Sequence, residues 1–381
     1  PLWNQWYAWS FLIQPVTAAY INEHHLRILE SYVEAPELHA MAAKKSALRG
    51  GAFLENSEGV AAARALIEQT KSRLGKHRQL VQAIKKLDTL LQQEADGCSL
   101  ESFYDRVDEV LKGYIEIVYD LNNQPKIRFI EPLFYASEFY DESLQSFSFM
   151  ESSVDGRAFV LSSPRFTNES AVQIAQPFRS ELWDELFAMR WRGVTEAQLD
   201  TWIAQAATGL SPAQKAQFKR FFTAEPPKEN ADRDYQGEGV RVRYFGHATV
   251  LLQTRQVTVM TDPIISYPFD EGGNRYTLND LPEKIDYVVL THNHQDHVMF
   301  ETLLQMRQKI GTIVVPRCSG GDLQDPSLRL TLNAMGFKQV IELAELQTID
   351  IPGGGITGLP FLGEHGDLDV RSKLSICIQL N

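Results

Sequence analysis

Thr291-His292-Asn293-His294-Gln295-Asp296-His297 is the stretch of this 381-residue sequence that says most about its fold. It places three imidazoles and one carboxylate within six residues, and it directly follows the apolar run Tyr287-Val288-Val289-Leu290. A short apolar run rich in β-branched residues is typical of a buried strand. The sequence therefore predicts a dense group of potential metal ligands just past the end of a strand, where rigid scaffolds commonly display chemically active residues.

The residue types and spacing of this segment favour metal binding over a polar loop with incidental histidines. Neutral imidazoles bind zinc, iron and manganese, and a carboxylate adds a hard, charged oxygen. Residues two apart in extended backbone point to the same side, so we expect His292 and His294 to share one ion. Asp296 and His297 lie past a turn and could hold a neighbouring ion. A two-metal site would follow if distant loops add further ligands.

Composition bounds the class of protein. The length predicts two domains, and 44% hydrophobic with 23% charged residues is typical of a globular chain. The net charge of -12 argues against nucleic-acid partners, and no apolar run is long enough to predict a membrane span. The start of the chain lacks a basic region typical of a signal peptide, and Cys98, Cys318 and Cys377 form no closely spaced pair. We therefore expect a cytoplasmic location.

The first domain is expected to span residues 1–235 and to be a helix-rich α+β unit. The boundary is placed in the charged, proline-containing linker 225–234. Strands are predicted at 126–130 and in a hairpin that joins 147–150 to 157–161 around Asp155-Gly156. Apolar periodicity predicts helices over 16–48 with an exception at Pro36, from Ser57 with an interruption at Gly75, over 80–91, over 99–118, over 182–189 and after Ser211.

The second domain, residues 236–381, is expected to be an α/β sandwich because many short strands alternate with a few helices. Helices are predicted at 300–309 and 328–335. Strands are predicted at 240–245, 249–253, 257–261, 287–290, 312–316, 339–343, 347–351, 355–360 and 374–380.

From about residue 240 onward the sequence resembles the metallo-β-lactamase superfamily. The resemblance rests on the pattern His-x-His-x-Asp-His after an apolar strand, and on Gly246-His247-Ala248-Thr249 and Thr261-Asp262-Pro263, which look like the opening strands of that fold. It implies an αββα metallo-β-lactamase-type sandwich. We expect His247 to lie near the metal site without being a ligand, and Asp262 to orient a ligand histidine.

The third metal motif of the superfamily matches the segment that contains Gly363-Glu364-His365. Glu364 and His365 are adjacent, so one of them is expected to point at the first metal. A histidine would give an ordinary zinc hydrolase site, whereas a glutamate would favour iron or manganese. Glu364, together with the large N-terminal domain, resembles a smaller branch, the diiron β-hydroxylases of chloramphenicol biosynthesis. In that interpretation Glu364 is a ligand and His365 lies behind it.

This resemblance implies a function, a cofactor and partners. The function is hydroxylation of the β-carbon of an amino acid tethered to a carrier protein of a nonribosomal peptide synthetase. Two iron ions would be held by His292, His294 and Glu364 and by Asp296 and His297, with O₂ as co-substrate and an external electron donor. The N-terminal domain would dock the carrier protein or form a homodimer.

Two other classes of function stay open at this point. A lactonase or phosphodiesterase would use two zinc ions, with His365 as ligand and Asp296 orienting the water. An interaction module would need no metal.

The superfamily also needs a later bridging Asp and a final His. No histidine follows His365, and Asp367 and Asp369 lie too close to Glu364 to match the bridging Asp. We therefore expect the sandwich to be truncated in its C-terminal half, with the missing ligands beyond Asn381.

Overall fold

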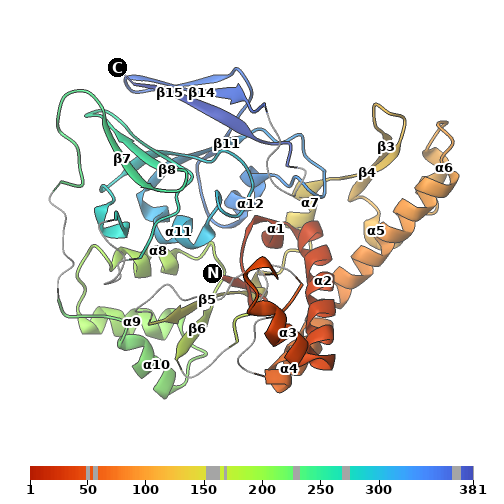
Figure 1. The fold of residues 1–381 in the computed structure, drawn as a ribbon, viewed down its shortest axis with the longest axis horizontal. Coiled ribbons are helices and arrows are strands. Elements are labelled where there is room, and N and C mark those ends of the chain that lie inside the picture. Colours follow the sequence, from red (N-terminus) through yellow and green to blue (C-terminus); the bar gives the residue numbers. More distant parts are fainter. Residues whose placement is uncertain are drawn as a thin grey trace.

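The computed structural model describes residues 1–48, 52–54, 59–151, 164–166, 170–225, 232–267, 275–362 and 370–380. Figure 1 shows a helix-rich N-terminal part and a sheet-rich part that carries the C-terminus. This agrees with the predicted order of a helix-rich unit followed by an α/β sandwich. None of the described helices combines the length and the apolar content needed to cross a bilayer.

The helices of the N-terminal part begin and end largely where the sequence predicts. The predicted helix over 16–48 is interrupted at Pro36, because proline has no N–H to donate to the preceding turn. The interruption at Gly75 is also confirmed, and Ser211 caps the last helix by accepting a hydrogen bond from Gln214 N at 3.3 Å. The helices are α1 (Ser10–Ile13), α2 (Pro15–Glu34), α3 (Pro36–Ala43), α4 (Gly59–Arg73), α5 (Gly75–Glu94), α6 (Glu101–Tyr104), α7 (Glu131–Tyr135), α8 (Glu181–Ala188), α9 (Glu196–Ala206) and α10 (Pro212–Lys219).

The predicted helix over 99–118 is wrong. It is replaced by the short α6, a 3-10 turn at Glu109–Leu111, and the strand β3 (Ile115–Tyr119). Gly113 has φ +81°, which ends the helical path, and Ile117 then pairs with Ile127 of β4 (Pro125–Phe129). Apolar residues whose spacing also fits one face of a helix thus form a strand with alternating sides, because β4 provides a strand for them to pair with.

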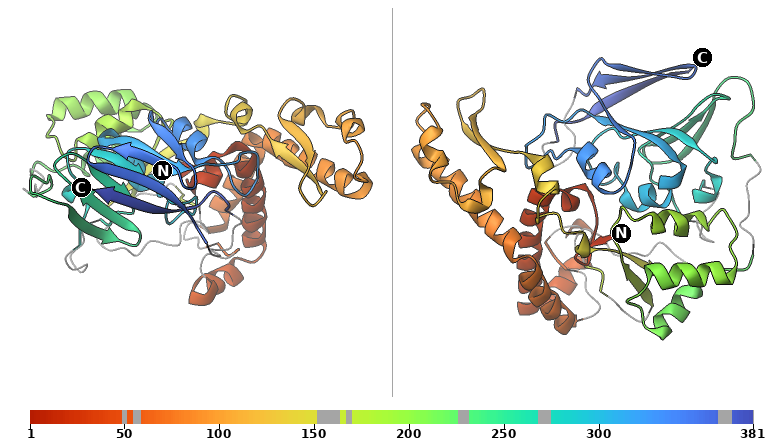
Figure 2. Two further views of the ribbon diagram at one scale, coloured as in Figure 1. Left: turned by 90° about the horizontal axis from the view of Figure 1, so that it is seen from above. Right: turned by 180° about the vertical axis from the view of Figure 1, so that it is seen from behind.

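α5, α6 and the β3–β4 hairpin project from the rest of the molecule as an arm (Figure 2). The arm has its own apolar core, formed by residues such as Leu80, Ile84 and Ile117, and this core reaches Val16 of α2. β4 connects the base of the arm to the C-terminal part, because Phe129 N donates to Gly321 O at 3.1 Å.

A small antiparallel sheet, ordered β2-β1-β5-β6, belongs to the N-terminal part. Its strands are β1 (Leu2–Trp3), β2 (Trp6–Tyr7), β5 (Gln145–Met150) and β6 (Ala171–Ala175). The predicted strand at 147–150 is confirmed as β5, and β5 pairs with β6. The predicted hairpin partner at 157–161, with Asp155-Gly156, lies outside the described residues.

The C-terminal part contains two sheets, and its predicted strands are confirmed with small shifts at their ends. The larger sheet has the order β12-β11-β10-β9-β8-β7, with parallel pairs from β12 to β9 and antiparallel pairs from β9 to β7. The smaller sheet has the order β13-β14-β15. The strands are β7 (Arg241–Gly246), β8 (Thr249–Gln253), β9 (Thr258–Thr261), β10 (Ile285–Val289), β11 (Ile310–Pro316), β12 (Val340–Leu343), β13 (Thr348–Ile351), β14 (Gly354–Pro360) and β15 (Leu374–Leu380).

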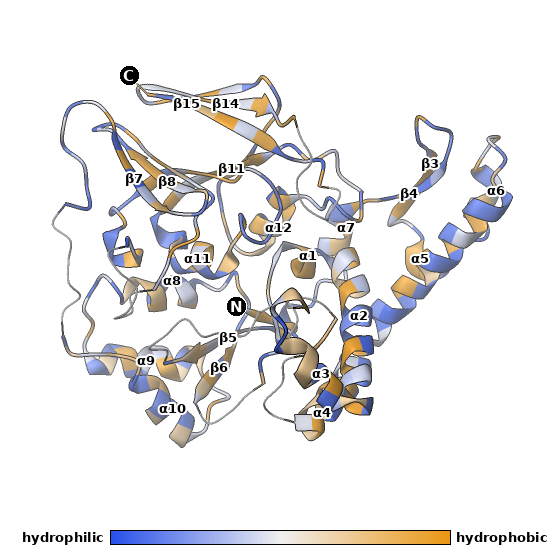
Figure 3. Cartoon of the chain, in the orientation of Figure 1, coloured by the Kyte–Doolittle hydropathy of each residue, from blue (hydrophilic) through white to orange (hydrophobic). Residues whose placement is uncertain are grey.

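Alternating residues of the central strand β10 face two different cores. Val288 belongs to the cluster that contains the leucines of α11 (Phe300–Gln305) and α12 (Leu328–Ala334), whereas Val289 packs with Ile356 of the smaller sheet. Figure 3 shows hydrophobic residues in β8 and β11 of the same sheet. The structure therefore has a helix layer and two sheets. Within the described residues no helix covers the outer face of the smaller sheet, and the fourth layer and the truncation of the sandwich stay predictions.

The two parts share one apolar core. A single cluster of buried side chains runs from Trp183 of α8 to Phe300 and Leu304 of α11. Arg307 crosses this interface: its Nε and Nη2 donate to the carboxylate of Asp184, both at 2.9 Å, and its Nη1 donates to Phe178 O and Met335 O at 2.7 and 2.6 Å. This guanidinium is 7% exposed and well partnered, as a buried charge requires.

Candidate metal centre

The histidine-rich loop follows the C-terminal end of β10, an interior strand of the larger sheet. Leu290 N still donates to Val314 O at 2.9 Å, and His292 then forms an isolated antiparallel bridge with Lys373. The chain turns immediately afterwards, because His297 N and Val298 N both donate to His294 O, at 3.0 and 2.9 Å. His292 thus lies at the bridge to Lys373, His294 stands at the start of the turn, and the turn itself carries Asp296 and His297. We call residues 291–298 the metal loop.

The first two histidines converge as their spacing predicts. His292 Nε2 and His294 Nδ1 lie 3.1 Å apart, and the ring centroids are 4.6 Å apart. Two nitrogens bound to one ion at about 2 Å and at right angles lie roughly 3 Å from each other. The pair therefore has the spacing of two ligands of a single ion, and His292 is 5% exposed.

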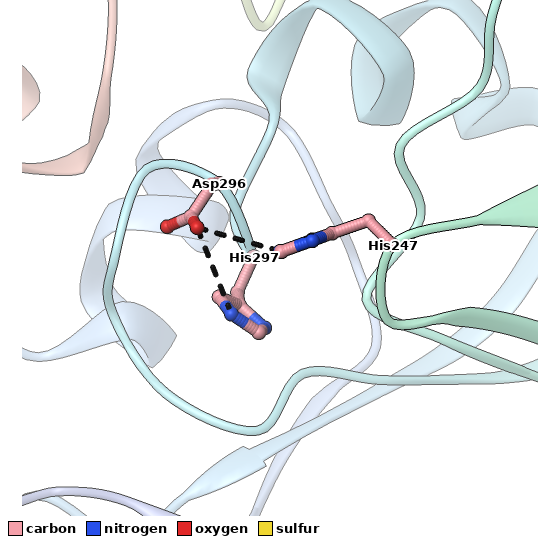
Figure 4. A group of neighbouring side chains, drawn as sticks. All are labelled: His247, Asp296 and His297. Atoms are coloured by element: carbon pink, nitrogen blue, oxygen red, sulfur yellow. Dashed lines mark ion pairs between the residues drawn. The ribbon is translucent and has the colours of Figure 1, made fainter. Parts of the chain in front are cut away.

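A second group forms where the turn of the metal loop meets the β7–β8 turn. His247 Nε2 lies 3.4 Å from Asp296 Oδ2, and His297 Nε2 lies 4.0 Å from the same oxygen (Figure 4). One ligand atom from each of these three side chains falls within 4.8 Å of the others. The structure thus places His247 close enough to Asp296 and His297 to be a third ligand of one ion. That His247 lies near the site without being a ligand stays a prediction.

The buried carboxylate of Asp262 holds both Thr291 and His297 of the metal loop. It is 1% exposed and accepts hydrogen bonds from Thr291 N at 2.8 Å, from Thr291 Oγ1 at 2.6 Å and from His297 Nδ1 at 2.8 Å. The last contact assigns the proton to Nδ1 and directs Nε2 of His297 toward Asp296. A carboxylate behind a histidine is the usual support of a metal-ligating imidazole. Thr291, which the sequence did not single out, also contacts this group, because its Oγ1 lies 2.9 Å from His292 Nδ1; its place between the strand and His292 was the available signal.

Two side chains of the site sit on strained backbone. His247 has φ +48° and Asp262 has φ +32°, values that residues with a Cβ seldom adopt. The turn around His247 is fixed by Gly246 at φ +115°, and by Thr261 Oγ1, which donates to Ala248 O at 2.7 Å. Strain of this kind persists where surrounding contacts hold it, and it is concentrated at functional sites.

The donor set fits iron. It combines imidazole nitrogens with a carboxylate, supported by the buried Asp262, and contains no thiolate. The predicted residues Glu364 and His365 lie outside the described residues. The structure therefore brings together His292 with His294, and Asp296 with His297 and His247, and it places Asp262 behind His297.

Comparison with known proteins identifies the family. The model described as the diiron non-heme beta-hydroxylase N-terminal domain matches residues 1–226. The chain is 36% identical over 379 residues to the 4-amino-L-phenylalanyl-[CmlP-peptidyl-carrier-protein] 3-hydroxylase of Streptomyces venezuelae, covering 98% of this chain and 70% of that protein. The chain belongs to the diiron non-heme β-hydroxylase family.

Structural similarity supports the same family. The crystal structure of the diiron beta-hydroxylase CmlA from Streptomyces venezuelae superposes with a TM-score of 0.89 at 36% identity, covering all of this chain and 71% of that one. Residues 241–361 match the beta-lactamase superfamily domain. A UPF0173 protein of Pyrococcus abyssi is 37% identical over 127 residues, covering 33% of this chain and 50% of that protein.

Membership confirms the resemblance drawn from the sequence. This β-hydroxylase is an enzyme of a diiron family whose chemistry uses two iron ions and O₂. It also decides between the functions left open by the sequence, because the match along 98% of this chain is to a hydroxylase and not to a zinc hydrolase or an interaction module.

Proposed function

We propose that this protein hydroxylates the β-carbon of an aminoacyl group tethered to a carrier protein of a nonribosomal peptide synthetase. The observation that carries the proposal is the metal loop, with converging His292 and His294 and the Asp262-supported His297, in a chain that matches a carrier-dependent 3-hydroxylase along 98% of its length. Bound iron would supply the redox chemistry that activates O₂ for insertion into a C–H bond.

The proposed ligands divide between the two ions as the geometry of the loop suggests. His292 and His294 would hold the first iron together with Glu364, and Asp296 and His297 would hold the second. Asp262 fixes the orientation of His297 through the 2.8 Å contact. His247 would either add a ligand to the second iron or hold the Asp296 carboxylate in place. His365 would lie behind Glu364.

The partners follow from the reaction. Insertion of one oxygen atom of O₂ into a C–H bond reduces the other atom to water, which consumes two electrons and two protons. An external electron donor would supply those electrons. A reduced, iron-loaded enzyme without a donor should therefore hydroxylate no more than one substrate per site, and sustained turnover should depend on added reductant.

The N-terminal unit, residues 1–235, would dock the carrier protein or form a homodimer. α3 supports such a contact because it exposes two large apolar side chains, Leu38 (53%) and Met41 (60%). Sedimentation of the wild type and of the Leu38→Glu/Met41→Glu double variant would test the homodimer. A wild type that is monomeric at high concentration would contradict it.

The direct test of function uses the aminoacylated carrier protein as substrate. The iron-loaded enzyme is mixed with it, a reductant and isotopically labelled O₂. We expect one labelled oxygen atom on the β-carbon, detected by mass spectrometry of the released amino acid. Ester hydrolysis by a colourless, zinc-containing protein, with no oxygen incorporated, would contradict the proposal.

A further inference from the structure

Asn293 stands between the two converging histidines, and its side chain points the other way. It is 1% exposed, and both ends of its amide are held. Its Oδ1 accepts a hydrogen bond from the Ser10 hydroxyl, and its Nδ2 donates to Pro326 O at 3.3 Å. Neither partner is a metal-loop histidine, and the backbone on each side of Asn293 leads directly to one of the two histidines. A residue held at this point of the chain therefore constrains the direction of both neighbours.

Ser10 reaches this position from the far end of the sequence. It opens α1, is fully buried, and lies 283 residues from Asn293 in the chain. A second contact from the same N-terminal segment supports the opposite end of the metal loop: the Tyr7 hydroxyl donates to Met299 Sδ at 2.6 Å. The start of the chain therefore contacts the metal loop between its first two histidines, and also the residue that directly follows the loop.

Pro326, the other partner of Asn293, belongs to a loop that is itself fixed. Glu131 of α7 accepts hydrogen bonds from Gly321 N and Ser327 N, both at 2.9 Å. Asp325 accepts from Ser372 N at 2.9 Å and from Ser372 Oγ at 2.7 Å. Asn293 is thus held between two rigid supports, of which one is the N-terminal helix α1.

We propose that Asn293 is a positioning residue, fixed by Ser10 and by the Pro326 carbonyl, and that through it the N-terminal region sets the spacing of His292 and His294. This rests on the proposed role of these histidines as iron ligands. Removal of the Ser10 hydroxyl leaves the buried Asn293 Oδ1 without its donor and lets the amide turn. The 3.1 Å approach of the two ring nitrogens then loses its support.

The experiment measures Fe(II) binding to the full chain by anaerobic titration against a chelator, together with thermal unfolding. Partners behind metal ligands typically change affinity about 10- to 100-fold, so we expect Ser10→Ala to weaken Fe(II) binding about 10-fold and Asn293→Ala at least as much. The double variant should bind no more weakly than Asn293→Ala, because Ser10 acts through Asn293. If either single variant fails to fold, the other decides.

Ser146→Ala is the matched control. Ser146 is a buried serine of β5 whose Oγ accepts from Gln173 Nε2 at 2.8 Å, away from the metal loop. It should keep wild-type affinity. Wild-type affinity in Ser10→Ala, additive losses in the double variant, or an equal loss in Ser146→Ala would each overturn the proposal. His292→Ala distinguishes a failure of the proposed ligand set from a failure of the positioning role. If His292→Ala also keeps wild-type affinity, the proposed ligand set is wrong. If His292→Ala loses Fe(II) while the Ser10 and Asn293 variants keep it, only the positioning role is wrong.

Discussion

The two halves of the metal loop differ in their surroundings. His292 and Asn293 are 5% and 1% exposed and are braced by residues from both ends of the chain. The side chain of Asp296 is 58% exposed, and that of its neighbour His247 is 47% exposed. The first half is therefore preorganised by packing, whereas the second depends on one buried carboxylate, Asp262, acting on His297.

This difference teaches where a substrate can approach. Exposed ligand side chains leave room for a substrate to approach the metal and for metal-bound molecules to exchange, whereas buried ones hold the metal in a fixed position. We expect variants of the first half to disturb the metal site as a whole, and variants around the second half to have more local effects.

The largest expected effect is that of His292→Ala. It removes one of two converging nitrogens from a buried position, so the first iron should be lost and hydroxylation should fall by more than about 100-fold. Asp296→Ala should lose the second iron with the first still bound. Iron content per chain checks both. Two irons retained in His292→Ala would contradict the assignment of the first half.

A somewhat smaller effect is expected for Asp262→Ala. Without its acceptor, the His297 ring loses its fixed tautomer and orientation, so Fe(II) affinity should fall about 10- to 100-fold. Asp286→Ala is the control, because the Asp286 carboxylate also accepts a backbone hydrogen bond in this sheet, from Thr258 N at 2.9 Å, but away from the metal loop. Similar losses in the two variants would show that sheet stability, and not histidine orientation, is what changes.

Glu131→Gln tests a carboxylate that contacts the backbone and no histidine. Burial raises the pKa of Glu131, while hydrogen bonds from Ser327 N and Gly321 N lower it. An amide can accept only one of these two hydrogen bonds well, so the free energy of unfolding should fall by about 1–3 kcal/mol. Fe(II) affinity should change less than in Ser10→Ala. Denaturant unfolding measures the free energy of unfolding, and metal titration measures the Fe(II) affinity. A loss of Fe(II) affinity as large as that in Ser10→Ala would contradict a purely structural role for Glu131.

The smallest expected effect is a loss of folding stability at acid pH. His25 is buried and stacked on Trp6, with ring centroids 3.6 Å apart, and burial, with help from His24, lowers its pKa to about 3. The unfolded chain binds this proton near pH 6.5 and the folded one does not, so stability is complete above that pH and is lost as the pH falls toward 3. The loss is about 1.4 kcal/mol per pH unit.

His25→Phe keeps an aromatic ring on Trp6 and should remove this part of the slope. Urea unfolding of the wild type and the variant between pH 7 and 5.5 measures the difference. Parallel pH profiles would contradict the assignment to His25.

The sequence was most informative where the relevant contacts are local. His292 to His297 carry their ligand pattern within one loop, and the strand before them carries the apolar run that places it. Ser10 and Asn293 could not be paired in this way, because nothing near either residue marks a contact across 283 positions. Ile117 was assigned to a helix because its strand partner, Ile127, becomes visible only in the folded hairpin.

The most direct test of the account is an iron-edge anomalous diffraction map of the iron-loaded protein. We expect one peak within bonding distance of His292 and His294 and a second beside Asp296 and His297. Peaks that lie elsewhere, or a signal at the zinc edge in place of the iron edge, would contradict the central claim that this loop holds the two irons of a hydroxylase.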